Sequence, residues 1–389
     1  MEEKAYVGLL TEILALSLNE ADCPVSVKER LDHHTLTAIY RYAKKHDLSH
    51  IIYGFLQKNG INAEPELLAK LKKDAMTAIY RYEGIKYCFN EICGILEENN
   101  IAFVTLKGAV LRDHYPKDLL RTSCDVDILV READIDTAVA ALKSRGYRYG
   151  ERNYHDVSMY SPGNVLLELH FSITENMDSL DRVLKDAWSY AHAADGSRME
   201  FCKEFFTFHI YAHMAYHFLT GGCGLRSLMD IWVMENRMQC SYVCASELLK
   251  KAGIYRFAQK ISELSKKCFS GEALDSFDEK VFCYVLDGGV YGSTENSVAV
   301  RKNVSGSNLK YALKRLFLPY KTMVVPYPVL KKAPYLLPFF WVVRWFKALF
   351  GGKFNRMTRE FSFAASLDEE RLSEIKEICQ TLELQEVQK

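Results

Sequence analysis

The sequence has no excess of either charge: its 389 residues include fifty Lys and Arg and fifty Asp and Glu. This balance argues against a protein that coats nucleic acid through bulk positive charge, although a local basic groove is compatible with it. Hydrophobic residues make up 49% of the chain and charged residues 26%, which excludes a disordered or fibrous protein. At about 100–200 residues per domain, the length predicts two or three globular domains.

Paired CxxC motifs are missing as well. The eleven cysteines are odd in number and are scattered from Cys23 to Cys379. This pattern predicts reduced, mostly buried thiols in a cytoplasmic protein. Cys240 and Cys244 lie four residues apart, but no second ligand pair completes a zinc site.

No signal peptide is expected from the Met-Glu-Glu-Lys start, and no apolar run is long enough to cross a bilayer. The most apolar stretch, 335–350, has only sixteen residues and includes Pro338, Arg344 and Lys347. A transmembrane helix needs about twenty largely uncharged residues. Two interpretations stay open for this stretch: it packs against the body of the protein, or it lies in a membrane interface.

The distribution of residue types divides the chain into four expected regions. Residues 1–99 carry apolar residues at helical spacing with few Gly or Pro, and predict helices. Residues 100–172 predict a small mixed sheet, 173–300 a return to helices that line its cleft, and 301–389 an aromatic, Pro-rich segment and a helix. The Gly, Ser and Asn of 285–308 predict a loop. The expected fold class is α+β, with a small mixed-sheet core embedded in mostly helical flanking regions.

The string Thr-Ala-Ile-Tyr-Arg-Tyr occurs twice in the first region, at 37–42 and 77–82. One interpretation is a helical repeat of forty residues. The other is two similar amphipathic helices, and we favour it because little outside this string matches.

Short strands and helices alternate in the expected core. The turn Ser161-Pro162-Gly163-Asn164 has the composition of a hairpin turn, and Gly146 suits the end of a helix. The sequence predicts strands at 101–106, 125–130, 155–160 and 165–171, and helices at 109–114 and 132–145.

Asp125 and Asp127 lie two residues apart on a predicted strand, so their side chains point to one face. Neighbouring carboxylates repel each other and are costly to bury, and a hard divalent cation such as Mg²⁺ is a usual compensation. Glu168 stands in the otherwise apolar strand 165–171. If this strand lies beside 125–130, three carboxylates converge, as a two-metal site for nucleotidyl transfer requires. The alternative is that Asp125 ends its strand and Glu168 faces water.

Lys107 and Gly108 stand at a predicted junction between strand and helix. Glycine allows close backbone approach to an anion, and a helix N-terminus offers free N–H groups. Lys107 adds a point charge for phosphate, and Arg121 can add a second.

These residues carry a resemblance to a known family. The segments LKGAVL, YP, CDVDILV and LLELHF occur in that order, with an Arg before the third. They resemble the DNA-polymerase-β-like nucleotidyltransferase superfamily and, more narrowly, the bacterial proteins called uncharacterised nucleotidyltransferases. The segment HIYAHMAYHFLTGGCGLRSLMDIWVM and the Pro/aromatic tail at 326–346 are also similar to that group. The similarity covers about 100–350, and 101–171 is its most specific part.

The resemblance implies a mechanism. Asp125 and Asp127 would hold two Mg²⁺ ions, and Glu168 would complete the catalytic metal site and help to deprotonate an acceptor hydroxyl. That hydroxyl would attack the α-phosphate of a nucleoside triphosphate such as ATP and expel pyrophosphate. Lys107-Gly108 departs from the Gly-Ser pair usual in the superfamily, which weakens any transfer of phosphate contacts from its better-known members, although the narrower group shares the Lys-Gly form.

His209, His213 and His217 follow one another at intervals of four on a predicted helix. They predict a His-only zinc site, a line of histidines that faces the cleft, or packed core histidines. We expect His213 and His217, with Arg226, to contact the nucleotide or the acceptor. Read as residues alone, Arg226 and Asp230 are most simply a pair on the surface of the next helix.

The sequence favours a cytoplasmic enzyme that acts on a nucleoside triphosphate and an unidentified acceptor: a sugar, antibiotic, peptide, protein or RNA. Two alternatives remain. One is a catalytically silent module of the same fold that binds a nucleotide or a partner, against which the three intact carboxylates count. The other is a toxin-like enzyme that adds AMP to a protein, although such enzymes are often little more than the core.

Overall fold

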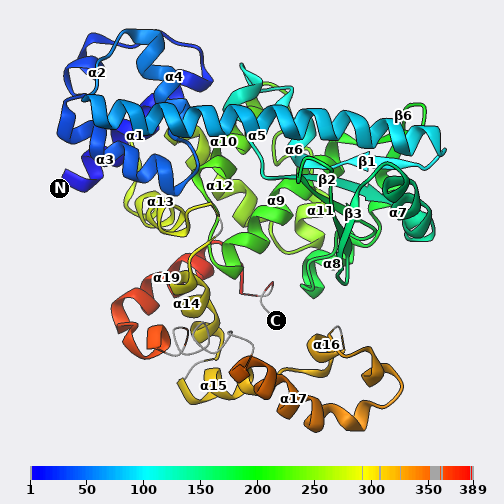
Figure 1. The fold of residues 1–389 in the computed structure, drawn as a ribbon. Helices are drawn as coiled ribbons and strands as arrows, with labels where there is room; N and C mark the ends of the chain where they lie inside the picture. Colours follow the sequence, from blue (N-terminus) through cyan, green and yellow to red (C-terminus); the bar gives the residue numbers. More distant parts are fainter. Residues whose placement is uncertain are drawn as a thin grey trace.

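In the computed structural model, the chain is described over residues 2–290, 292–305, 308–324, 326–350, 360, 362–385 and 387. These residues form a mixed sheet surrounded by helices, which confirms the expected α+β class with helical flanks (Figure 1). Within the same residues, no helix combines the length and the apolar character that crossing a bilayer would require.

Helices alone make up the N-terminal region, as predicted. The long helix α5 runs from the other N-terminal helices across to the sheet, and so links the two (Figure 1). The repeated string falls in α3 and α5, where Tyr40 is half-buried but Tyr80 is 83% exposed. These are two different helices, of 13 and 34 residues, rather than two copies of one unit. The helices are α1 (Glu2–Leu18), α2 (Val25–Glu29), α3 (His33–Lys45), α4 (Ser49–Asn59) and α5 (Pro65–Glu98).

Seven strands form one sheet in the order β3-β4-β5-β2-β1-β7-β6. β2 runs parallel to β5 and β1 parallel to β7, and the other neighbours are antiparallel. The predicted strands at 101–106, 125–130, 155–160 and 165–171 are present, the first shortened to three residues. The strands are β1 (Phe103–Thr105), β2 (Asp125–Val130), β3 (Arg148–Arg152), β4 (Asp156–Tyr160), β5 (Leu166–His170), β6 (Ala191–Asp195) and β7 (Arg198–Phe201).

The hairpin β6–β7 lies within the region 173–300, where helices were expected, so that prediction is wrong at 191–201. Its turn places Gly196 at a φ of 53°, which suits glycine. β7 then pairs with β1, where Phe103 lies opposite Arg198. This pairing joins strands about ninety residues apart, and no local sequence pattern announces it.

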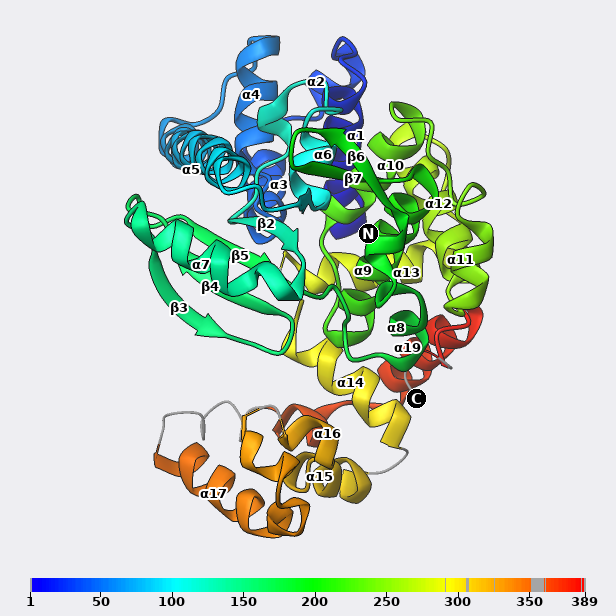
Figure 2. The ribbon, with the colours of Figure 1, turned by 90° about the vertical axis from the view of Figure 1, so that its right-hand side faces the viewer.

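One face of the sheet is covered by α5 and by α7 (Ile135–Ser144) (Figure 2). Val126 and Ile128 of β2 and Leu167 and Leu169 of β5 share a buried apolar cluster with these two helices. The side chains that alternate with them point to the opposite face, which the strand period of two requires.

Helices return after the sheet. The loop expected at 285–308 is wrong over 294–305, which forms α14, and at its two ends, which belong to α13 and α15. Residues 291, 306 and 307 lie outside the described residues. Val298, Ala299 and Val300 are buried there, so tertiary packing outweighs the loop-like composition. The later helices are α8 (Asp178–Leu184), α9 (Lys203–Thr220), α10 (Leu225–Asn236), α11 (Ser246–Lys251), α12 (Tyr255–Ser270), α13 (Ser276–Gly288), α14 (Thr294–Ser305), α15 (Asn308–Leu316), α16 (Tyr320–Met323), α17 (Leu337–Phe350) and α19 (Glu369–Thr381).

The remaining short elements are α6 and five 3₁₀ turns. They are α6 (Lys107–Arg112), η1 (Asp118–Leu120), η2 (Glu132–Asp134), η3 (Ala187–Tyr190), η4 (Pro328–Lys331) and η5 (Pro334–Leu336).

Candidate active site

Acidic side chains meet where β2 and β5 lie side by side. The parallel register places Asp127 directly opposite Glu168, and Asp125 lies two residues earlier on the same face. All three line one cavity of about 420 Å³. The sequence-predicted carboxylates are therefore brought to one place by a strand pairing that the sequence only proposed.

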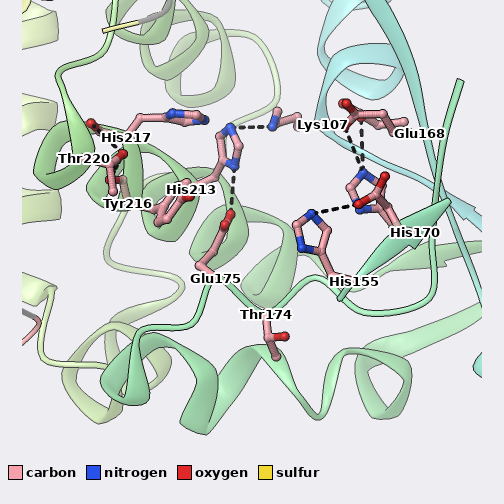
Figure 3. Close-up of polar contacts among 12 residues, drawn as sticks. Lys107, His155, Glu168, His170, Thr174, Glu175, His213, Tyr216, His217 and Thr220 are labelled. Carbon is pink, nitrogen blue, oxygen red and sulfur yellow. Dashed lines mark hydrogen bonds and ion pairs between the residues drawn. The ribbon is translucent and has the colours of Figure 1, made fainter. Parts of the chain in front are cut away.

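His170 joins this cluster, and the sequence analysis missed it. Its Nε2 lies 3.3 Å from Asp127 Oδ1 and 3.7 Å from Glu168 Oε2 (Figure 3). Donor atoms of Asp127, Glu168 and His170 all lie within 4.8 Å of one another, a spacing that one metal ion can bridge. The signal was available, because His170 follows Glu168 by two residues and so shares its face. Asp125 stands beside this group and is not part of it.

The electrostatics of the cluster show a shortage of positive charge. Burial and the neighbouring Asp127 carboxylate raise the pKa of Glu168 to about 7. Burial and Asp127 also raise the pKa of Asp125. Burial opposes ionisation of Asp127, but the hydrogen bond from His170 and the charge of Lys107 outweigh it and lower its pKa. Such a site favours a bound cation.

Lys107 and Gly108 form the first turn of α6, which begins two residues earlier than predicted. The helix follows β1 after the single residue Leu106, so the end of that strand places its first turn at the cavity. A Cβ on Gly108 would lie 3.5 Å from Arg121 Nη1, an ordinary contact distance. The glycine thus leaves open the space in front of the Arg121 guanidinium.

Arg121 is buried and held by a carboxylate. Its Nε and Nη2 donate to Asp230 at 3.1 and 2.9 Å, and Tyr115 Oη donates to the same side chain at 2.7 Å. The expected surface pair of Arg226 and Asp230 is therefore wrong. Asp230 of α10 faces inward to Arg121, whereas Arg226 donates to Asp47 at 3.0 Å. Both side chains find stronger partners in the tertiary structure than they offer each other along the helix.

The histidines of α9 face the same cavity. His213 Nε2 contacts Lys107 Nζ, and its Nδ1 lies 3.2 Å from Glu175 Oε1. Figure 3 shows Lys107 between His213 on one side and Glu168 and His170 on the other. The rings of His213 and His217 meet edge to face with centroids 4.2 Å apart.

Burial favours the neutral form of these histidines. Burial, with a smaller effect of the Lys107 charge, lowers the pKa of His209 to about 3 and that of His217 to about 4. The same causes hold the pKa of His213 well below its usual value. Among the described residues, the three rings do not come together as a set of donors for one ion. The three rings are therefore packed histidines that line the cavity, and they do not form a zinc site.

The cavity has the size of a small-ligand site. Its volume of about 420 Å³ lies in the range typical of such pockets. A second cavity of about 150 Å³ adjoins it, and Lys107, Arg121, His213, His217 and Arg226 line both. Every predicted site residue therefore lines the main cavity.

Comparison with known proteins identifies a family. A family model described as "uncharacterised nucleotidyltransferase" matches residues 32–270, more than half of the chain. The match begins just before α3 and ends with α12, so it includes α3, α4 and α5 as well as the sheet, but not α1 and α2. No curated protein and no solved structure matches.

Proposed function

The chain belongs to the family of uncharacterised nucleotidyltransferases. On this premise we propose that it transfers a nucleoside monophosphate group from a nucleoside triphosphate to an acceptor hydroxyl, with Mg²⁺ and with release of pyrophosphate. One observation carries the proposal. Asp127 and Glu168 lie opposite each other on β2 and β5, in a cavity that Lys107 and Gly108 also line. Clustered carboxylates that share a cavity with a cationic helix start are the arrangement that nucleotidyl transfer needs.

The residues fit a divalent cation. Asp127, Glu168 and His170 would hold one ion, and Asp125 would complete the binding of a second together with Asp127. The raised pKa of Glu168 supports this, because the cluster lacks the charge that keeps that carboxyl ionised at neutral pH. Bound Mg²⁺ supplies charge neutralisation at the phosphates and favours the ionised form of the acceptor hydroxyl.

The cationic side of the cavity would bind the triphosphate. Lys107 Nζ lies between His213 and the acidic cluster, and Arg121 Nη1 points to the space in front of Gly108. Asp230 and Tyr115 hold the Arg121 guanidinium in place, so that it does not have to be ordered when substrate binds. His213 positions Lys107 in the same way through its contacts with Lys107 and Glu175.

Glu168 would accept the proton of the acceptor hydroxyl. Its side chain is 34% exposed, against 16% for Asp127, so an incoming acceptor reaches Glu168 more readily. The helix α9 walls the cavity on the side of His213 and His217. The two histidines and Arg226 would then orient the triphosphate tail or the acceptor for in-line attack.

The test is transfer of label. The protein is incubated with each α-labelled nucleoside triphosphate in turn, with Mg²⁺ and with cell extract, and labelled products are separated by size and chemistry. We expect one nucleotide to label an acceptor with the wild type, and no label with Asp127→Asn. Asp136→Asn is the matched control, since Asp136 is 88% exposed on α7 and lies outside the cavity.

Other outcomes select the alternatives. Nucleotide binding that depends on Mg²⁺, without label on any product, would identify a silent nucleotide-binding module. Label on protein would identify a protein-modifying enzyme. Equal nucleotide affinity with and without metal, measured by calorimetry, would contradict the metal site itself.

A further inference from the structure

Charge is distributed unevenly along this neutral chain. Residues 308–350 contain eight Lys and Arg and no Asp or Glu, so the rest of the chain has eight more acidic than basic residues. The same stretch contains α15, α16 and α17. We call this stretch, without residue 325, the C-terminal lobe; it lies at one end of the molecule, away from α2 and α4 (Figures 1 and 2).

The inner face of α17 is packed. The rings of Trp341 and Trp345 meet Phe317 edge to face, with centroids 5.1 and 5.3 Å from it. Their Nε1 atoms donate to the backbone carbonyls of Leu318 and Leu316 at 2.8 and 3.0 Å. These contacts fix which side of α17 points outward, and they account for part of the apolar stretch as ordinary packing.

The outer face of the same helix is apolar and exposed. Phe339 and Val342 of α17 are 60% and 41% exposed, and Tyr335 of the preceding turn η5 is 79% exposed. The spacing of three residues places Phe339 and Val342 on one face of the helix. With Tyr335 just before them, they make an exposed apolar line along this part of the chain. Lys331 and Lys332 are exposed just before this line, and among the described residues neither has an acidic partner. An exposed apolar stripe bordered by lysines marks an interaction surface.

We propose that the C-terminal lobe docks on a lipid surface rich in anionic headgroups. Aromatic side chains at one face of a helix enter the boundary between headgroups and acyl chains, and neighbouring Lys and Arg attract anionic lipids. The lobe supplies both features and has no acidic residue of its own. Two of its basic residues, Arg315 and Lys321, pair with Glu360 and Asp178 outside the lobe, and Lys331 and Lys332 keep their charge next to the apolar line. The helix lies on the bilayer, because its 14 residues extend only about 21 Å against a hydrocarbon core of about 30 Å.

The apolar character of the stripe favours lipid over nucleic acid. A nucleic-acid surface sets basic groups among stacking rings along a backbone groove. Here Lys331 and Lys332 lie only at one end of the stripe, and the stripe includes the aliphatic Val342, which cannot stack on a base. This proposal does not depend on the transfer activity.

The experiment is cosedimentation of the full chain with vesicles of phosphatidylcholine, with and without phosphatidylglycerol. We expect binding to the anionic vesicles that is at least tenfold tighter than to the neutral ones and that weakens with salt. The triple variant Tyr335→Ser, Phe339→Ser, Val342→Ser should lose it. Lys331→Glu with Lys332→Glu should lose the preference for anionic lipid. The matched control is Tyr80→Ser with Tyr87→Ser, two exposed tyrosines of α5.

Several results would overturn the proposal. They are absence of binding to anionic vesicles, equal binding by the triple variant, or equal loss in the α5 control. Binding to RNA but not to vesicles would assign the lobe to nucleic acid instead. Self-association, measured by light scattering and abolished in the triple variant, would assign it to a second copy of the chain. Thermal unfolding is measured for each variant, and the lysine variant carries the test if the triple variant does not fold.

Discussion

The two faces of the β2–β5 strand pair are formed by alternating residues of the same two strands, and they have opposite effects on the stability of the fold. Val126, Ile128 and Leu169 point to α5 and α7 and are at most 3% exposed. Asp127 and Glu168 alternate with them and point into the cavity below α9. One face removes apolar surface from water and stabilises the fold, whereas the other gathers like charges and costs stability.

The contrast teaches how an unstable site is supported. The apolar face anchors β2 and β5 in register, and that register alone brings Asp127 opposite Glu168. The acidic face is then ready for a cation without any rearrangement of the chain. Substitutions on the two faces should accordingly affect different measurements.

The largest effect is expected from Asp127→Asn. It should lower the rate of nucleotidyl transfer by about a thousandfold, since it removes a carboxylate from the centre of the cluster. The free energy of unfolding should change much less than the rate, by about 1–2 kcal/mol, because the substitution relieves repulsion with Glu168 but gives up the attraction of the carboxylate to His170 and Lys107. Rate assays and urea denaturation measure the two quantities. A large loss of stability with normal activity of the folded protein would erase the contrast between the faces.

Leu169→Ala tests the other face. Leu169 is fully buried beside α5 and α7, so its truncation should cost about 2–5 kcal/mol of unfolding free energy. Transfer by the fraction that remains folded should be nearly unchanged. Denaturation curves together with activity per folded molecule check this, and a greater loss of activity than of folded protein would show that the register is more fragile than we infer.

The pH dependence of stability separates the faces further. Burial lowers the pKa of His217 to about 4, below its unfolded value of about 6.5. As the pH falls, the unfolded chain therefore binds a proton at this histidine before the folded protein does. The contribution of this histidine to the free energy of unfolding is highest above pH 6.5 and decreases as the pH falls toward 4. We expect wild type to lose up to about 3 kcal/mol relative to His217→Asn over that window.

Taking the difference between wild type and variant removes the opposite contribution of the glutamates. Burial raises the pKa of Glu168 and of Glu175 to about 7. The contribution of these two glutamates to the free energy of unfolding is therefore fully present below pH 4.5 and is lost as the pH rises toward 7. Leu169→Ala should leave the pH profile parallel to that of wild type. A parallel profile for His217→Asn as well would mean that this histidine is not held neutral in the folded state.

The smallest expected effect is that of Gly108→Val. Its side chain would extend from the first turn of α6 toward Arg121 Nη1, and we expect nucleoside triphosphate affinity to fall at least tenfold, or about 1.4 kcal/mol. Gly94→Val on α5 is the control, because a Cβ there meets no atom within 4 Å. Calorimetry measures the nucleotide affinity of both variants. Unchanged affinity for Gly108→Val would show that the first turn of α6 does not contact the nucleotide.

Much of the core was readable from the sequence for a local reason. Strand periodicity alone puts Asp125 and Asp127 on one face of β2 and the alternating Val126, Ile128 and Val130 on the other. The hairpin turn at 161–164 and the apolar run before Lys107 are likewise local signals. His170 was within reach of the same periodicity, as the residue two beyond Glu168.

Only the tertiary structure determines which side chains and which strands pair with each other. Arg226 and Asp230 are neighbours along α10, yet Asp230 binds Arg121 and Arg226 binds Asp47, each more than a hundred residues away. Likewise β7 completes the sheet through β1, and α14 forms where the composition predicts a loop. Sequence spacing fixes which side chains share a face, because backbone geometry repeats over a few residues. It cannot fix which faces meet, because that choice minimises the free energy of the whole chain.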